Sequence, residues 1–253
     1  MTQNAKPIIL WDNLLARPGA VITATSSDPD HPVEYLADWR EYLTWQAGSG
    51  SLQNIELDLG SAQAADTLAI YQHNLHSAGI TGVTLYGSDN GTDWTQVVEH
   101  PVDSDAPILE TFNAAAYRYF KLALAVGGEP AEIGLLFIGG RLQFPSWPAS
   151  GFDPNPEEQA LERARSEEGF LLGTVLKYER RRIQLSFSHL SDSWVRENLI
   201  PFWDAHIPRP FLFAWDCLNH PEEIYLVEIS EPKRELPYNP VFRSLRLELE
   251  GRV

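Results

Sequence analysis

The feature that most constrains the fold is a series of short, strand-like runs over roughly the first 145 positions. They read AVITATS, NIELDLG, TLAIYQ, GVTLYGS, TQVVEH, YRYFKLAL and IGLLFIGGRLQF, with Gly, Asn, Asp and Pro between them. Alternating β-branched and aromatic residues favour strands, and regularly spaced turn residues favour many short ones. The pattern predicts a mainly β protein whose N-terminal part is a jelly-roll β-sandwich.

The sequence divides into two blocks connected by a linker. Residues 1–144 form the predicted jelly-roll domain, and residues 145–168 a Pro-rich linker with a short connector helix capped by Asn155. Residues 169–253 read as strand, strand, helix, strand, strand, strand, which predicts a smaller α+β domain resembling a split barrel. In this second domain, Arg180, Arg181 and Arg182 fall where the first hairpin is expected to turn.

Charge and composition exclude several classes of function. The formal net charge is −16, from 35 acidic and 19 basic side chains, so direct binding to a nucleic-acid backbone is not expected. Cys217 is the single cysteine and has apolar neighbours, which predicts a buried thiol and no disulfide. No apolar stretch approaches the ~20 residues that cross a bilayer. We expect no membrane insertion and no signal peptide.

The polar run SDNGTDW, residues 88–94, is either a turn or a metal loop. Asn90 and Gly91 both tolerate positive φ, which favours a tight hairpin. An EF-hand loop counted from Asp89 would need an oxygen ligand at Gly91 and a glutamate at His100, so the calcium pattern fails. The run predicts a turn.

Several of these stretches resemble a known family in the expected order. GVTLYGSDNGTDWTQV resembles the hairpin of discoidin-like domains, also called factor 5/8 type C or galactose-binding-like domains. VITATSS, YLADWREYLTWQAG, IELDLG and YRYFKLAL resemble other segments of that family, over most of residues 20–142. The resemblance implies an eight-stranded jelly roll.

The same resemblance implies a structural calcium ion, for which Asp38 and Thr44 are the candidate ligands. The glycine that follows the family's aspartate is Trp39 here, and the spacing to Thr44 is longer. The alternative is that Asp38 is a turn residue and that Thr44 and Trp45 belong to strand and core. No other cofactor is expected.

Loops at one end of a jelly roll often bind sugars through aromatic and polar side chains. The candidate glycan-binding residues are Trp39, Tyr42, His73, Asn74 and His76. The alternative for His73 and Asn74 is that they satisfy backbone groups of a structured loop. An exposed aromatic ring on this face would favour glycan binding, and a sealed face would favour assembly.

The second block resembles another family. WVRENLIPFWDAHIPRPFLFAWD is similar to a helix–strand segment of siphophage distal-tail and minor-tail proteins, and YQHNLHSAGITGVTLYGS to discoidin-like modules of phage tails. These resemblances imply a structural tail-tip subunit of the virion, made in the host cytoplasm. Copies of the subunit would form a homo-oligomeric ring, and the ring would contact other tail proteins. Arg180, Arg181 and Arg182 are candidates for its subunit interface.

Two hypotheses about function follow, and neither involves catalysis. The first is a tail-tip component that acts in assembly and in contact with the host surface. The alternative is a non-catalytic carbohydrate-binding protein that uses the loop face of the jelly roll. No Gly-rich phosphate loop and no nucleophile elbow is present in the sequence.

Overall fold

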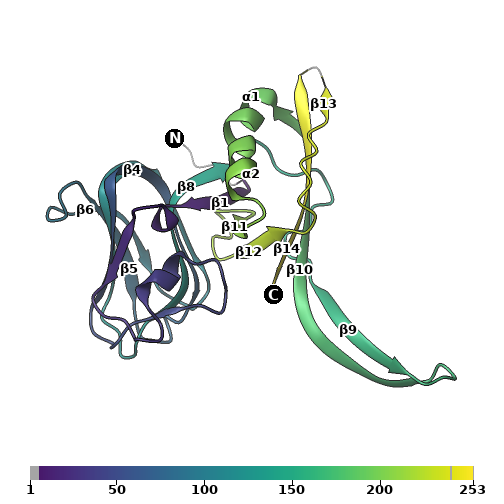
Figure 1. The fold of residues 1–253 in the computed structure, drawn as a ribbon, viewed down its shortest axis with the longest axis horizontal. Coiled ribbons are helices and arrows are strands. Elements are labelled where there is room, and N and C mark those ends of the chain that lie inside the picture. Colours follow the sequence, from purple (N-terminus) through teal and green to yellow (C-terminus); the bar gives the residue numbers. More distant parts are fainter. Residues whose placement is uncertain (1–5, 240, 253) are drawn as a thin grey trace.

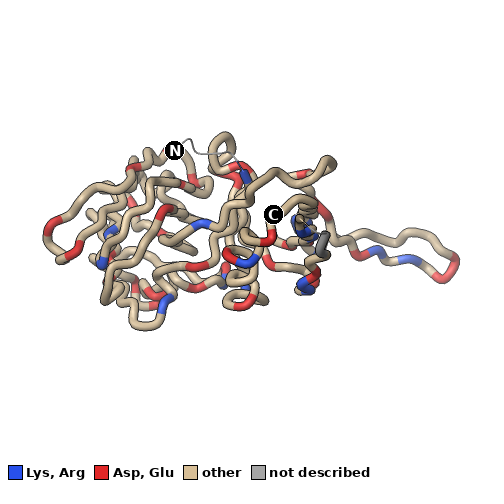
Figure 2. Tube along the Cα trace, turned by 90° about the horizontal axis from the view of Figure 1, so that it is seen from above, with Lys and Arg blue, Asp and Glu red and all other residues tan. Residues whose placement is uncertain are grey.

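Antiparallel β-strands make up 52% of the structure and helices 9%, which confirms the predicted fold class. The computed structural model describes residues 6–239 and 241–252. The N-terminal part is a β-sandwich, and the C-terminal part is a smaller β-rich unit with a helix packed on it (Figure 1). One extended hairpin projects away from both parts (Figures 1 and 2).

The β-sandwich is built from strands that alternate buried and exposed residues. Its elements are β2 (Val21–Ala24), η2 (Val33–Ala37), β3 (Trp45–Gln46), β4 (Gln53–His73), β5 (Gly82–Ser88), β6 (Thr95–Pro101), β7 (Ile108–Leu124) and β8 (Glu132–Gln143). In β5, Val83 and Leu85 are buried on the core side. Alternation of this kind places every second side chain against the facing layer.

The predicted hairpin turn lies between β5 and β6. Gly91 has φ +76°, a conformation that glycine adopts without steric cost. The side-chain oxygen of Asn90 accepts hydrogen bonds from the backbone N–H groups of Thr92 and Asp93, at 2.9 Å each. Nζ of Lys121 lies 4.0 Å from the ring centre of Trp94, which therefore packs beside the hairpin. The turn prediction is confirmed.

Two elements precede β2 in the chain: β1 (Ile8–Asn13) and η1 (Leu14–Ala16), whose Leu14 and Leu15 are buried in the sandwich core. The C-terminal part contains β9 (Glu158–Arg165), β10 (Leu171–Ser191), α1 (Asp192–Trp194), η3 (Val195–Leu199), α2 (Ile200–His206), β11 (Phe211–Ala214), β12 (Ile224–Ile229), β13 (Tyr238–Asn239) and β14 (Phe242–Arg252). The hydrogen-bonded order across the molecule is β6-β5-β7-β4-β8-β1-β11-β12-β14-β10-β9.

The first strand joins the two parts. β1 pairs with β8 on one side and with β11 on the other, so the sheet runs from the sandwich into the C-terminal part. Leu10 is buried in a cluster to which both parts contribute, together with Phe137 of β8 and Leu212 of β11. Cys217 is buried in the same cluster, as predicted, and burial raises the pKa of its thiol. The boundary at residue 144 stays a prediction.

One continuous helical segment follows β10 and covers the C-terminal core. The side chain of Ser191 accepts a hydrogen bond from the N–H of Trp194 and so caps the start of the segment. Residues Val195–Leu199 are π-helical and lead directly into α2, where Pro201 lies near the N-terminus. Because proline cannot donate a backbone hydrogen bond, it accounts for the local change of helix type before Pro201.

The predicted connector helix is wrong, because Glu158–Arg165 is a strand. β9 pairs with residues Leu171–Arg180 of β10, and a turn with Gly169 at φ +85° connects them. The expected helix cap, Asn155, instead accepts a hydrogen bond from Arg181 at 2.8 Å. An isolated helix this short is not stable in water, whereas a partner strand lies directly across the turn.

The expected turn at the arginine run is also wrong. Arg180, Arg181 and Arg182 lie within β10 and pair there with β14. Arg180 forms ion pairs with Glu158 at 3.0 Å and with Glu250 at 2.8 Å. Arg181 lies 3.8 Å from Glu157, and Arg182 lies 3.0 Å from Glu248. All three arginines therefore have carboxylate partners within the chain, and a role for them at a subunit interface stays a prediction.

Among the described residues, no helix is both long enough and apolar enough to cross a membrane.

Candidate binding cleft

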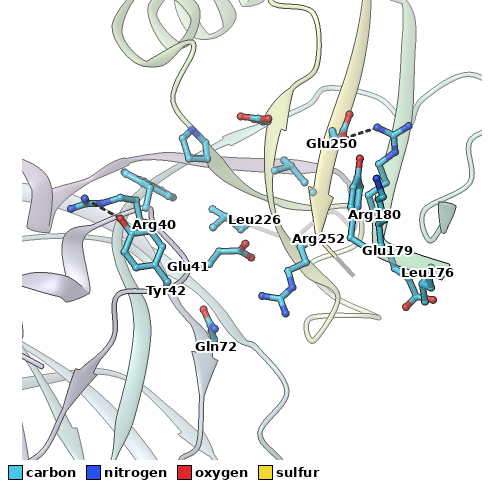
Figure 3. Close-up of a pocket in the computed structure, with 17 residues that line it drawn as sticks. Arg40, Glu41, Tyr42, Gln72, Leu176, Glu179, Arg180, Leu226, Glu250 and Arg252 are labelled. Carbon is cyan, nitrogen blue, oxygen red and sulfur yellow. Dashed lines mark hydrogen bonds and ion pairs between the residues drawn. The ribbon is translucent and has the colours of Figure 1, made fainter. Parts of the chain in front are cut away.

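A cleft of about 1010 Å³ lies where the two parts of the molecule meet (Figure 3). One wall is the loop Trp39–Tyr42, together with Gln72 near the end of β4. The opposite wall comes from β10, β12 and β14, and includes Arg180, Glu250 and Arg252. The lining is both aromatic and charged, which is the composition that binds polar ligands with an apolar face.

The loop that carries Tyr42 is held by a short chain of polar contacts. The Asp38 carboxylate accepts hydrogen bonds from the Arg40 backbone at 3.0 Å and from its guanidinium at 2.9 and 2.6 Å. Arg40 then donates to the hydroxyl of Tyr42 at 3.3 Å. The Arg40 guanidinium holds the pKa of the Asp38 carboxyl below its usual value, so Asp38 is ionised at neutral pH.

Tyr42 is the exposed aromatic residue of this wall. Its side chain is 74% exposed, and the guanidinium carbon of Arg40 lies 5.8 Å from the centre of its ring. At this distance the guanidinium is attracted to the ring. The cleft therefore carries an accessible aromatic ring next to a positive charge.

Trp39 has the opposite environment. It is half-buried, and its ring meets the ring of His206 edge-on at 5.5 Å between ring centres. Nε2 of His206 donates to the carbonyl oxygen of Pro210 at 2.7 Å, which fixes the neutral tautomer with the proton on Nε2. Burial lowers the pKa of His206. Trp39 thus anchors the loop to the C-terminal part.

The other polar groups of the cleft come from separate strands. Figure 3 shows Arg252 extending from β14 toward the side that carries Glu41 and Gln72. Glu228 of β12 also lines the cleft. Carboxylates, an amide and guanidinium groups together provide both hydrogen-bond donors and acceptors.

Three of the predicted glycan-binding residues do not line the cleft. Asn74 donates to the carbonyl oxygen of Pro130 at 3.2 Å and accepts from the N–H of Glu132 at 2.7 Å, so its side chain holds a loop. His73 is buried and accepts from the N–H of Leu75 at 3.3 Å. Desolvation by burial lowers the pKa of His73. His76 is exposed on the turn that follows β4.

The two candidate calcium ligands do not fit a calcium ion. The guanidinium of Arg40 occupies the place beside Asp38 that a cation would take. The hydroxyl of Thr44 donates to Glu132 at 2.7 Å. Calcium needs several oxygen ligands that are not already paired with a cationic side chain.

Sequence reasoning identified Trp39 and Tyr42 but missed the rest of the cleft. Arg40 and Glu41 stand in the same polar and aromatic run as Tyr42, so their position next to it in the sequence could have indicated them. Gln72 and Arg252 are brought to the cleft by long-range strand pairing, for which the sequence carries no local signal.

The fold and the cleft define a β-sandwich domain with a ligand-sized opening beside its loops. Residues 21–136 match the model of the F5/8 type C domain, which supports the discoidin-like resemblance of this part of the chain. No finding supports the predicted tail-protein domain.

Solved structures with similarity to about half of the chain include three carbohydrate-binding modules. One is CpGH89CBM32-5 from Clostridium perfringens in complex with GalNAc-β-1,3-galactose (22% identity, 47% of this chain and 94% of that chain, TM-score 0.41). Another is chitosan-binding module 1 of a chitosanase/glucanase from Paenibacillus sp. IK-5 (22% identity, 51% of this chain and 98% of that chain, TM-score 0.44). The third is the CBM32 of AlyQ with 4,5-unsaturated mannuronic acid (21% identity, 54% of this chain and 98% of that chain, TM-score 0.41). No curated protein matches the sequence.

Proposed function

We propose that this chain is a non-catalytic carbohydrate-binding protein and that the glycan binds in the cleft beside Tyr42. The observation that carries the proposal is the exposed ring of Tyr42, which Arg40 holds at the opening of a ligand-sized cleft. The match of residues 21–136 to the F5/8 type C domain supports it.

The chemistry of the cleft suits a sugar. A pyranose ring presents a face of C–H groups, which packs on an aromatic ring, and a rim of hydroxyls, which both donate and accept hydrogen bonds. Tyr42 offers the aromatic face. Glu41, Gln72 and Arg252 offer acceptors and donors around it. An acidic sugar would pair with Arg252, and a neutral sugar would use the carboxylates and the amide.

The test is a glycan array with the full chain, followed by calorimetric titration of the strongest ligand. Tyr42→Ala should weaken binding by about tenfold, since one aromatic contact contributes ~0.5–1.5 kcal/mol beyond its buried area. Tyr42→Phe should retain most of the affinity because it keeps the ring.

Trp147 provides the matched control, because its side chain is 43% exposed and does not line the cleft. Trp147→Ala should bind as the wild type does. The proposal fails if no glycan on the array is retained, or if Trp147→Ala and Tyr42→Ala weaken binding equally.

A second candidate function is a structural role in a larger assembly, as a tail-tip subunit in the virion. The observation that favours it is the apolar hairpin formed by β9 and the first half of β10, where Phe170 is 67% and Leu172 68% exposed. The tail-tip assignment rests on the sequence resemblance of residues 194–216. Light scattering over a concentration series tests it: a discrete trimer or hexamer would support a ring, and a monomer or dimer would count against one.

A further inference from the structure

The cleft adjoins a second, smaller hollow of about 280 Å³. The smaller hollow has three lining residues of its own, which are Tyr71, Asp105 and Pro107. Glu41, Gln72 and Arg252 line both the cleft and the smaller hollow. These three residues, called the junction below, therefore lie between the two hollows, and all three are labelled in Figure 3.

We infer that Gln72 is a specificity-determining residue and that the glycan spans both hollows. The protein would then recognise an oligosaccharide rather than a single sugar, with the amide of Gln72 bound near the point where two sugars join. The inference rests on the proposed carbohydrate-binding function and states the size of the ligand that the same site accepts.

The polar groups of the junction are free to bind a ligand. In the part of the chain that the structure describes, none of the three side chains forms a hydrogen bond or an ion pair. Two other cations of the cleft differ, because Arg40 pairs with Asp38 and Arg180 with Glu250. A carboxylate, an amide and a guanidinium together offer acceptors and donors, which the hydroxyls of a sugar can match.

The backbone of Gln72 has an unusual conformation. Its φ is +57°, and every other described residue with a positive φ is a glycine. This left-handed conformation is unfavourable for a residue with a Cβ, and where it persists it often marks a functional site. The flanking pairs are regular, since Tyr71 pairs with Leu135 and His73 with Ile133. The strain is therefore confined to the residue whose side chain enters the junction.

Gly134 of β8 leaves room for the side chain of Gln72. A Cβ added at Gly134 would lie 3.0 Å from Oε1 and 3.1 Å from Cβ of Gln72. The side chain of Gln72 thus passes over backbone that carries no side chain, and Figure 3 shows it extending toward Glu41. Gly134 is therefore a positioning residue for the Gln72 amide.

Together the two hollows are larger than one sugar needs. Pockets of ~300–1,000 Å³ hold drug-sized molecules, whereas a hexose has only about twelve non-hydrogen atoms. The cleft alone has about 1010 Å³, and the smaller hollow adds about 280 Å³. Tyr71 and Pro107 are half-buried and give the smaller hollow an apolar side, on which the C–H face of a second sugar can pack.

The experiment is calorimetric titration of the full chain with ladders from monosaccharide to tetrasaccharide. The ladders are β-1,4-linked glucose, β-1,4-linked N-acetylglucosamine and α-1,4-linked galacturonic acid, together with the fragments of the glycan that the array retains best. For at least one ladder, the affinity should rise by about tenfold or more between the monosaccharide and the trisaccharide.

Gln72→Gly should remove most of this rise while the melting temperature stays the same or increases, because glycine adopts a positive φ without steric cost. A side chain with only a structural role would give the opposite result, a lower melting temperature with the rise intact. Gln96→Gly is the control, since Gln96 is exposed on β6 and lines neither hollow. It should lower the melting temperature slightly and leave every affinity unchanged.

The outcomes separate this inference from the proposed function. If monosaccharides bind as tightly as the longer sugars of every ladder, the inference is wrong while carbohydrate binding stands. If Gln72→Gly keeps the full rise in affinity, or loses it only together with a fall in melting temperature, the role of Gln72 is refuted. If neither the array nor any ladder shows binding, the proposed function fails and the inference fails with it.

Discussion

Replacing Leu10 by alanine should destabilise both parts of the chain together. Leu10 is fully buried in β1, in a cluster that also contains Phe137 of β8 and Leu212 of β11. A Leu→Ala change in a core costs ~2–5 kcal/mol, and more where the site cannot collapse. Because β1 is hydrogen-bonded on both sides, it has little freedom to move into the cavity. We therefore expect a loss of about 3–5 kcal/mol in the free energy of unfolding.

Urea denaturation of the full chain measures the loss, and hydrogen exchange with mass spectrometry shows where it falls. Amides of β7 in the sandwich and of β12 in the C-terminal part should lose protection together. Leu52→Ala is the control, since Leu52 is 51% exposed and a surface change costs less than ~0.5 kcal/mol. If β12 loses protection while β7 keeps it, the two parts are independent and the reasoning about β1 is wrong.

Three further predictions follow. Gly139→Ala should destabilise the chain by ~1–3 kcal/mol, because its Cβ would lie 2.4 Å from the Asp12 carbonyl oxygen; Gly140→Ala, with open space around it, is the control in thermal denaturation. Burial lowers the pKa of His206 in the folded state, so protonation of this side chain favours the unfolded chain. The free energy of unfolding should therefore be unaffected by His206 above about pH 6.5 and should decrease as the pH falls from that value to the lower folded-state pKa. His206→Gln should flatten that slope in unfolding titrations; an unchanged slope would refute the assignment. Asp38→Asn should weaken glycan binding by about threefold to tenfold, because Arg40 and Tyr42 lose their anchor, and calorimetry checks it.

Local patterns in the sequence determined much of the fold. Alternation placed Val83 and Leu85 in the sandwich core, and the Asn90–Gly91 pair fixed the hairpin turn. Ser191 marked the start of the helical segment. Each of these features depends on residues within a few positions of one another, so it can be recognised in a single sequence.

Tertiary structure alone decided the rest. β9 is rich in residues that favour helices, yet pairing with β10 makes it a strand. Arg180 forms ion pairs with carboxylates of β9 and β14, and both Tyr42 and Arg252 line the cleft although they are far apart in the sequence. Strand register, edge position and shared cores depend on contacts between distant segments, and such contacts leave no periodic signal in the sequence of either segment.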